Sequence, residues 1–266
     1  MRPIPILSAA GTRTIEAIAR DRTLLVLDFD GTLAPIVDAR NGAYPRPETR
    51  ALLRATSLLY PCAVVSGRAR LDVAARVEGV PLVAVIGCHG AEPGFGPLDR
   101  RLAATVVGWR ERLEELRDLP GVELEDKRFS IALHYRRAPD HAAALHRILA
   151  VAGRLRDARV TCGKAIVNVT PLGAPTKGDA IQALCRRLGA RVAVYVGDDR
   201  TDEAAFRAEV VSIAIRVGQG PDSSASYALP SQEAVDDLLR ALLAARARQD
   251  GRVEWSGLVR CVVEAP

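Results

Sequence analysis

Aromatic residues and long apolar runs are scarce in this chain. Aromatic side chains make up 4% of its 266 residues, and its basic residues are scattered along the sequence instead of forming a dense run. These features disfavour a nucleic-acid groove with stacking platforms. No apolar stretch approaches the roughly 20 residues that cross a bilayer, so we expect no membrane partner. The proline-broken stretch from Met1 to Leu7 is too short for a signal peptide, which predicts a cytoplasmic protein.

Cysteine occurs five times, an odd number, and never as a C-x-x-C pair. This spacing fits neither a zinc site nor a disulfide framework. We therefore expect most of the cysteines to be small buried residues. They are Cys62, Cys88, Cys162, Cys185 and Cys261.

Lysine is rarer still, although the chain is basic, with a net charge of +5. Of its 37 basic residues only Lys127, Lys164 and Lys177 are lysine. A position that keeps lysine in an arginine-rich chain is a candidate for a role that needs a compact, rotatable ammonium. The mild positive charge suits a small anionic substrate.

A short apolar run followed by two acidic residues is the most informative pattern in the sequence. Residues 24–27 read Leu-Leu-Val-Leu and predict a buried strand; Asp28 and Asp30 follow before Gly31 allows a sharp turn. Residues i and i+2 of a strand point the same way, so both carboxylates should project from the strand's carboxyl end. Ligands bind at that edge of open α/β sheets. Because adjacent carboxylates need a cation or a retained proton, a functional site is favoured over a plain Asx-type turn.

Short apolar strands alternate with helices in the first and last thirds of the chain, which indicates a parallel sheet. Between them, the order helix-strand-strand occurs twice and is typical of a separate α+β module. We predict an α/β fold with a doubly wound, Rossmann-like core (residues 1–94 and 172–266) and an inserted α+β cap domain (residues 95–171). The core strands are predicted at 24–27, 62–65, 80–86, 192–196 and 211–217, and its helices at 14–20, 47–59, 71–77, 178–188, 203–208 and 231–245. In the cap, helices are predicted at 98–116 and 140–149, and strands at 122–125, 130–135, 159–161 and 165–169.

Two further motifs carry groups that can hold phosphate. Ser66-Gly67-Arg68 follows the second predicted strand and offers a hydroxyl and backbone N–H groups to a phosphate; a plain serine N-cap is equally consistent with it. Thr176 and Asp179 resemble a capping box at a helix start. Lys177 lies in that first helical turn, where the macrodipole disfavours a cation, so we interpret it as reaching for an anion.

A final motif, Gly197-Asp198-Asp199-Arg200-Thr201-Asp202-Glu203, follows the fourth core strand. Acidic residues at a helix N-terminus are stabilising without any function. Asp198, directly after the strand and a glycine, is less easily explained that way. Its carboxylate is a natural oxygen ligand for Mg²⁺.

Together these four motifs resemble those of the haloacid dehalogenase superfamily of phosphatases, in the same order. The resemblance implies that Asp28 attacks phosphorus and that Asp30 acts as general acid and then general base. It implies Mg²⁺ as the cofactor. The phosphate-binding residues it implies are Gly31, Thr32, Ser66, Gly67, Arg68 and Lys177, and the metal ligands are Asp28, Asp30 through its carbonyl, Asp198 and Asp202.

The inserted module narrows the resemblance to the trehalose-6-phosphate phosphatase family. The motifs that carry it are Gly87-Cys88-His89-Gly90-Ala91-Glu92, Glu125-Asp126-Lys127-Arg128-Phe129-Ser130, His134-Tyr135-Arg136 and Gly163-Lys164. The resemblance implies hydrolysis of trehalose 6-phosphate, with Glu125 and Lys127 facing the distal sugar from the cap. For Glu125 a solvated strand-end charge is the competing interpretation, and we interpret His89 and His134 as structural histidines.

This sequence departs from the family pattern at one strand of the cap. Asn168 replaces a sugar-contacting carboxylate, and Thr170 replaces an arginine. Asn168 can still hydrogen-bond a sugar, but a phosphatase of another glycosyl phosphate, such as sucrose phosphate or a glycosyl-phosphoglycerate, becomes a credible alternative. A phospho-receiver domain is disfavoured because such modules are short, uncapped and lack the second aspartate. The only partner we expect is a small sugar phosphate, bound by a monomer.

Overall fold

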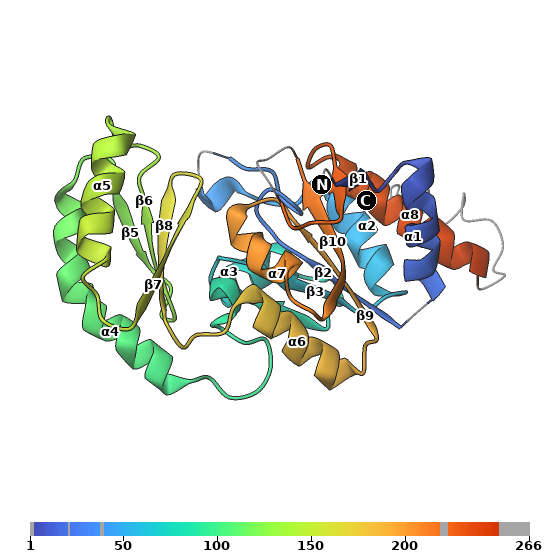
Figure 1. Ribbon diagram of the computed structural model, residues 1–266, viewed down its shortest axis with the longest axis horizontal. Coiled ribbons are helices and arrows are strands. Elements are labelled where there is room, and N and C mark those ends of the chain that lie inside the picture. Colours follow the sequence, from blue (N-terminus) through green and yellow to red (C-terminus); the bar gives the residue numbers. More distant parts are fainter. Residues whose placement is uncertain (1–2, 21, 38–39, 219–222, 250–266) are drawn as a thin grey trace.

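The computed structural model describes residues 3–20, 22–37, 40–218 and 223–249. Two sheets organise these residues (Figure 1). The helices are α1 (Ala9–Arg20), α2 (Pro47–Ser57), α3 (Arg70–Arg76), α4 (Arg100–Glu114), α5 (His141–Ala152), α6 (Lys177–Leu188), α7 (Glu203–Phe206) and α8 (Ala234–Gln249). The strands are β1 (Ile4–Pro5), β2 (Thr23–Leu27), β3 (Cys62–Val65), β4 (Ala84–Ile86), β5 (Glu123–Asp126), β6 (Ile131–His134), β7 (Ala158–Gly163), β8 (Ile166–Pro171), β9 (Val192–Gly197), β10 (Val211–Val217) and β11 (Tyr227–Leu229).

The larger sheet has the strand order β1-β11-β10-β9-β2-β3-β4, and all its pairings are parallel. From β2 the chain winds outward through β3 and β4, and later returns to the other side of β2 as β9, β10 and β11. The strand order therefore reverses between β2 and β9. In doubly wound sheets ligands bind at the carboxyl ends of the strands beside such a switch point.

Both faces of this sheet are buried because successive strand residues are apolar. Leu25 and Leu27 pack on one face with α1, α2, α3 and α8, whereas Leu24 and Val26 pack on the other with α6 and α7. This continuous apolar run is typical of a parallel sheet covered on both sides. It fixes β2 rigidly, and with it the acidic residues that follow.

The smaller sheet is antiparallel, with the order β5-β6-β8-β7. Figure 1 shows α4 and α5 on its outer side, away from the core. Trp109, Leu113 and Ile148 from these helices bury their side chains against Leu133 and Val167 of the sheet. The other face of the sheet is turned toward the carboxyl edge of the larger sheet and supplies the roof of the site described below.

The predicted fold class is confirmed: a parallel doubly wound core carries an antiparallel α+β cap. The division into core segments 1–94 and 172–266 and a cap of residues 95–171 stays our proposal. It is supported by the separate apolar clusters of the two sheets.

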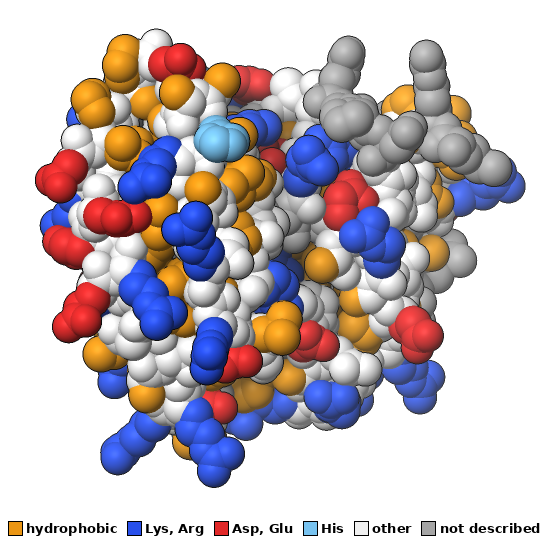
Figure 2. All heavy atoms as spheres, turned by 60° about the vertical axis from the view of Figure 1, so that its left-hand side comes forward, with side chains coloured by type: hydrophobic (Ala, Val, Ile, Leu, Met, Phe, Trp, Pro, Cys, Tyr) orange, Lys and Arg blue, Asp and Glu red, His pale blue; other side chains and the backbone are white. Residues whose placement is uncertain are grey.

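None of the described helices is long and apolar enough to cross a bilayer. Figure 2 shows basic and acidic side chains interspersed over the face that includes the cap.

The cysteines that the structure describes are all free. Cys62, Cys88 and Cys185 are buried and Cys162 is half-buried, as expected. Cys261 lies outside the described residues.

Candidate active site

Three carboxylates converge where β2 and β9 end. Oxygen atoms of Asp28, Asp198 and Asp202 lie within 4.8 Å of one another, and all three residues are buried. Asp28 follows β2 directly, Asp198 follows β9, and Asp202 belongs to the short 3₁₀ turn Arg200–Asp202. Gly31 allows this approach: its φ is +78°, and a Cβ there would lie 2.3 Å from Asp198 Oδ2.

Lys177 neutralises part of this acidic cluster. Its Nζ atom donates to Asp28 Oδ1 at 2.8 Å and to Asp202 Oδ1 at 2.6 Å, and only 2% of its side chain is exposed. Burial disfavours the ammonium, but Asp202 and Asp28 outweigh that effect and raise the pKa of Lys177. The predicted capping box is present: Thr176 and Asp179 exchange hydrogen bonds and begin α6 at Lys177. Lys177 thus contacts carboxylates at the predicted anion site.

A tyrosine supports the same cluster from the floor of the site. The hydroxyl of Tyr195, on β9, donates to Asp202 Oδ1 at 2.6 Å, and the tyrosine is fully buried. Burial and the neighbouring Asp202 raise the pKa of Tyr195, so its hydroxyl stays a donor. Asp202 also accepts from the backbone N–H of Asp199 at 2.9 Å. Asp202 is held by three donors and does not itself line the cleft.

The remaining negative charge suits a divalent cation. Burial raises the pKa of Asp28 well above its ordinary value, against the opposing effect of Lys177. Burial also raises the pKa of Asp198 to about 6, although Lys164 opposes the shift with an ion pair at 2.8 Å. Buried carboxylates that resist ionisation are stabilised when a cation binds among them. Asp28, Asp198 and Asp202 therefore fit a metal ion bound through oxygen ligands.

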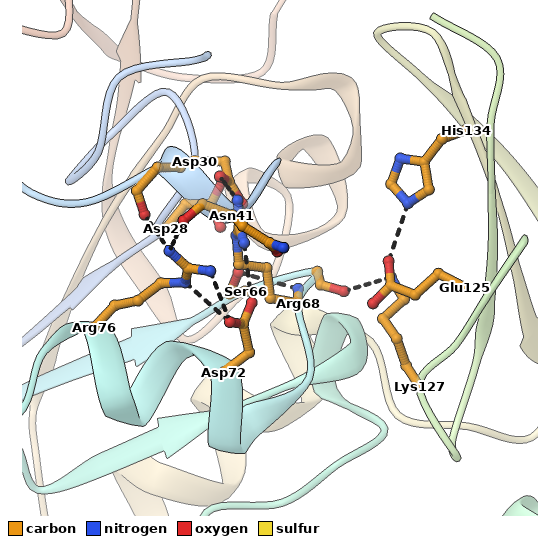
Figure 3. A network of polar contacts seen from close by, with 12 residues as sticks. Asp28, Asp30, Asn41, Ser66, Arg68, Asp72, Arg76, Glu125, Lys127 and His134 are labelled. Carbon is orange, nitrogen blue, oxygen red and sulfur yellow. Dashed lines mark hydrogen bonds and ion pairs between the residues drawn. The ribbon is translucent and has the colours of Figure 1, made fainter. Parts of the chain in front are cut away.

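Asp30 is placed differently from the other acidic residues. Its side chain is 40% exposed and is not one of the three converging carboxylates. Arg68 donates two hydrogen bonds to the Asp30 carboxylate, from Nε to Oδ2 and from Nη2 to Oδ1, each 2.7 Å long (Figure 3). Only the backbone carbonyl of Asp30 is thus consistent with its predicted role as a metal ligand.

The structure excludes one of the two interpretations of the Ser66-Gly67-Arg68 motif, the serine N-cap, and leaves the phosphate contact as a prediction. Helix α3 begins at Arg70 with Ala69 as its N-cap, so Ser66 is not a helix cap. Ser66 instead follows β3 and accepts a bond of 3.2 Å from the Arg68 N–H. Arg68 was predicted to bind phosphate, but its guanidinium is occupied by Asp30 and Asp72. The predicted phosphate contact of Arg68 stays a prediction, and in this structure its guanidinium binds these two carboxylates.

Thr32 completes the loop that follows β2. It is fully buried, and its Oγ1 atom has no hydrogen-bond partner among the described residues. Neither Thr32 nor Gly31 is among the residues that line the cleft. Their predicted contacts with phosphate stay a prediction.

The cap closes over this edge and leaves a cleft of about 240 Å³. Among the predicted residues, the cleft brings together Asp28, Asp30, Gly67, Arg68, Glu125, Lys127, Asn168, Lys177 and Asp198. Glu125 is not a solvated strand-end charge: it accepts from His134 Nε2 at 3.0 Å, inside the cleft. Lys127 reaches from the cap to the core and donates to the Gly67 carbonyl at 2.7 Å. Asn168 Oδ1 lies 3.5 Å from the same ammonium.

Thr170, which replaces an arginine of the family pattern, lies beside another arginine, Arg159. Thr170, on β8, pairs in register with Arg159 of β7, whose Nε donates to the threonine hydroxyl at 3.3 Å. Arg159 also donates to the Ala174 carbonyl at 2.9 Å. A guanidinium therefore lies beside position 170, although the residue there is threonine.

Several residues of the cleft were not among the predicted site residues. Lys164, the third lysine, reaches Asp198 from the turn between β7 and β8. His89 and His134 line the cleft, although both were interpreted as structural; His134 is paired with Glu125, whereas His89 Nε2 has no partner among the described residues. The scarcity of lysine was the available signal for Lys164. The remaining lining residues from the cap include Glu123, Arg136, Arg137, Ala165 and Ile166.

The doubly wound core, its inserted cap and the carboxylates at the switch point define a haloacid dehalogenase superfamily fold. The family model for trehalose-phosphatase matches residues 26–233, so the chain belongs to the trehalose-phosphatase family.

Individual relatives agree with this assignment. The chain is 34% identical over 229 residues to a trehalose-phosphate phosphatase of Mycobacterium marinum. The aligned region covers 79% of this chain and 58% of that protein. It is 30% identical over 264 residues to a probable trehalose-phosphate phosphatase of Oryza sativa subsp. japonica, covering 85% of this chain and 69% of the other. The solved C-terminal domain of trehalose-6-phosphate phosphatase from C. albicans has a TM-score of 0.76 at 20% identity, covering 92% and 98% of the two chains. The chain thus spans a little over half the length of the mycobacterial relative.

Proposed function

We propose that this protein is a Mg²⁺-dependent phosphatase that hydrolyses trehalose 6-phosphate to trehalose and phosphate. The observation that carries the proposal is the position of Asp28: it lies beside Lys177, within the acidic cluster, at the floor of a cleft roofed by the cap. A nucleophile, a cation site and a second carboxylate are the parts that phosphoryl transfer needs. Family membership supports the same activity.

The reaction we propose has two steps with Asp28 and Asp30 in different roles. An oxygen of Asp28 attacks phosphorus and forms an aspartyl phosphate, while the bond from phosphorus to the sugar oxygen breaks. Asp30 gives its proton to that leaving oxygen. Asp30 then takes a proton from the water that attacks the aspartyl phosphate, which releases phosphate and restores Asp28.

Residues around Asp28 hold the phosphate during both steps. We assign this role to the backbone of Gly31, Thr32 and Gly67, to the Ser66 hydroxyl and to the Lys177 ammonium. Asp28, Asp198, Asp202 and the Asp30 carbonyl would hold a metal ion, which would supply positive charge to the phosphate oxygens and keep the carboxylates ionised. The oxygen-only ligand set and the phosphate ligand favour Mg²⁺.

The cap supplies contacts for the sugar. Glu125 and Lys127 face the cleft, and Asn168 lies next to Lys127 in place of the family's carboxylate. A buried neutral amide at this position favours a second candidate substrate class, another glycosyl phosphate such as sucrose phosphate or a glycosyl-phosphoglycerate. A monomeric, cytoplasmic protein without membrane or nucleic-acid partners stays our prediction.

Phosphate release from a panel of phosphorylated sugars tests the proposal. We expect trehalose 6-phosphate to be the best substrate, with activity abolished by Asp28→Asn and by chelation of divalent cations. Higher turnover of another glycosyl phosphate would overturn the choice of substrate and leave the mechanism intact. No release from any phosphate ester would overturn the proposed activity itself.

A further inference from the structure

Asp30 belongs to a chain of charged groups that extends well beyond the cleft (Figure 3). The Arg68 guanidinium that holds Asp30 also donates through Nη1 to Asp72 Oδ2 at 2.9 Å. Arg76 in turn donates to the other oxygen of Asp72, with Nε at 3.0 Å and Nη2 at 2.9 Å. Asp72 and Arg76 lie one turn apart on α3, and neither was singled out in the sequence.

The far end of this chain is anchored to the backbone. Arg76 Nη1 donates to the Ala43 carbonyl at 2.7 Å and to the Asn41 carbonyl at 3.1 Å. Its guanidinium also stacks on the Tyr44 ring, 4.6 Å from the centroid. Arg68 and Arg76 are 7% and 5% exposed, respectively, so each is fixed by its neighbours. A guanidinium held at both ends can fix the direction of the carboxylate that it binds.

The Asp30 side chain is 40% exposed at the edge of the cleft, whereas the side chains of Arg68 and Arg76 are buried. Without the two hydrogen bonds from Arg68, an exposed aspartate samples several rotamers. Ordering it for proton transfer would then cost conformational entropy during the reaction. Each oxygen bound by Arg68 keeps a further lone pair that can hold or take a proton.

We propose that Asp72 and Arg76 are positioning residues for the acid-base chemistry of Asp30. They act through Arg68: Asp72 orients the guanidinium, and Arg76 ties Asp72 to the backbone at residues 41–44. This inference rests on the proposed phosphatase function. Through Asp72 and Arg76, helix α3 would help to orient Asp30 for proton transfer to the leaving sugar oxygen.

The leaving group provides a selective test of this role. A sugar alkoxide needs a proton as it departs, whereas p-nitrophenolate does not. The ratio kcat/KM reports the reaction through departure of the leaving group and excludes later hydrolysis of the aspartyl phosphate. We therefore compare trehalose 6-phosphate with p-nitrophenyl phosphate in Asp72→Asn and, independently, in Arg76→Gln. General acid catalysis contributes about 10²–10⁴-fold, so partial misalignment is expected to lower kcat/KM for the sugar ester by roughly tenfold or more.

The aryl ester should change by less than about threefold in the same variants, because its departure depends little on a general acid. Asp237→Asn is the matched control: Asp237 forms an Arg–Asp pair with Arg240 on the surface of α8, and its loss should affect neither ester. Equal losses for both esters would show a general structural role and overturn the inference. Unchanged values for both esters in both variants would overturn it as well. If the wild-type protein hydrolyses neither ester, the proposed function fails instead.

Discussion

Lys164, on the cap, forms an ion pair with Asp198, on the core, at 2.8 Å between Nζ and Oδ2. The lysine is 55% exposed, whereas the aspartate is 7% exposed. A cap ammonium thus lies on one of the three carboxylates that we assign to the metal. Lys164 and a metal ion bound at Asp198 would share this carboxylate, so we expect closure of the cap and binding of the metal to be linked.

Removing Lys164 should therefore strengthen metal binding in the absence of substrate. For Lys164→Gln we expect the Mg²⁺ dissociation constant to fall about fivefold, in line with roughly 1 kcal/mol for a solvent-accessible ion pair. Isothermal titration calorimetry measures this directly. Lys164→Arg keeps the charge and should leave the constant within about twofold of wild type by the same reasoning. Weaker binding by Lys164→Gln would contradict the competition.

The buried hydroxyl of Tyr195 should stabilise the fold through Asp202. Tyr195→Phe removes a 2.6 Å hydrogen bond to a buried carboxylate. We expect the free energy of unfolding to fall by about 2 kcal/mol, the range for hydrogen bonds to charged groups. Phosphate release should also fall, because Lys177 shares the same Asp202 oxygen. Urea denaturation and a phosphate assay measure the two effects.

Tyr60→Phe is the matched control for that substitution. Its hydroxyl is buried and donates to the carbonyl of Leu242 at 2.9 Å, away from the cleft. We expect a loss of about 1 kcal/mol in stability, typical of a neutral hydrogen bond, and unchanged activity. A full loss of activity in Tyr60→Phe, or none in Tyr195→Phe, would contradict the role given to Tyr195.

The capping box at Lys177 predicts a defined pH dependence of stability. The backbone and side-chain hydrogen bonds from Thr176 lower the pKa of Asp179. A carboxylate whose pKa is lowered on folding stabilises the native state above its unfolded pKa of about 3.9. That contribution is lost as the pH falls through the folded pKa.

Asp179→Asn should therefore be less stable than wild type by about 1 kcal/mol at pH 7, the usual value of a cap. The difference between the two proteins should shrink as the pH falls below about 4, because folded Asp179 takes up its proton at a lower pH than the unfolded chain does. Thermal unfolding at pH 7, 5 and 3 gives the comparison. A difference that persists undiminished at pH 3 would show that the carboxylate's charge is not involved.

Restoring a carboxylate at position 168 should shift substrate selectivity toward trehalose 6-phosphate. In Asn168→Glu the new charge lies next to Lys127. In the described part of the chain, this ammonium hydrogen-bonds the Gly67 carbonyl and the Asn168 amide oxygen. We expect kcat/KM for trehalose 6-phosphate to rise about tenfold, as for a charge-assisted hydrogen bond. Asn168→Gln adds the same length without the charge and should show no gain. If sucrose phosphate gains equally, position 168 does not set selectivity.

Most of the fold could be predicted from the sequence, because most strands are apolar runs long enough to be recognised. Strand β3 has its predicted limits, Cys62–Val65, and β2 begins one residue earlier than predicted. Strands β1 and β11 were missed because they have only two and three residues, and because both residues of β1 are exposed. Helix α1 begins at Ala9, five residues before the predicted start, and runs through Gly11. That glycine is needed because a Cβ there would lie 2.0 Å from the Ile6 carbonyl oxygen.

The site is predictable where it depends on single strand ends, and less so where it depends on contacts between elements. The order of strands places Asp28 and Asp198 together once β2 and β9 are recognised. The fork of Arg68 on Asp30 could not be inferred, because a guanidinium after a strand binds phosphate or carboxylate equally well. The pairing of Lys164 with Asp198 depends on how far the cap closes, which is a tertiary property. Glu125 came from family resemblance alone, whereas the scarcity of lysine also indicated Lys127.

The chain enters and leaves the cap at one place. Ala91 precedes the cap, Ala174 follows it, and both pack with Cys88 and the cap residue Phe129 in one small apolar cluster. Because the two ends of the insertion lie side by side at this seam, we expect that the cap can be exchanged as one unit. A foreign cap joined at this seam would leave the aspartates of the parallel sheet in place and would replace the sugar-facing wall together with Lys127 and Lys164, which contact the core. New specificities could then evolve on an unchanged set of core aspartates.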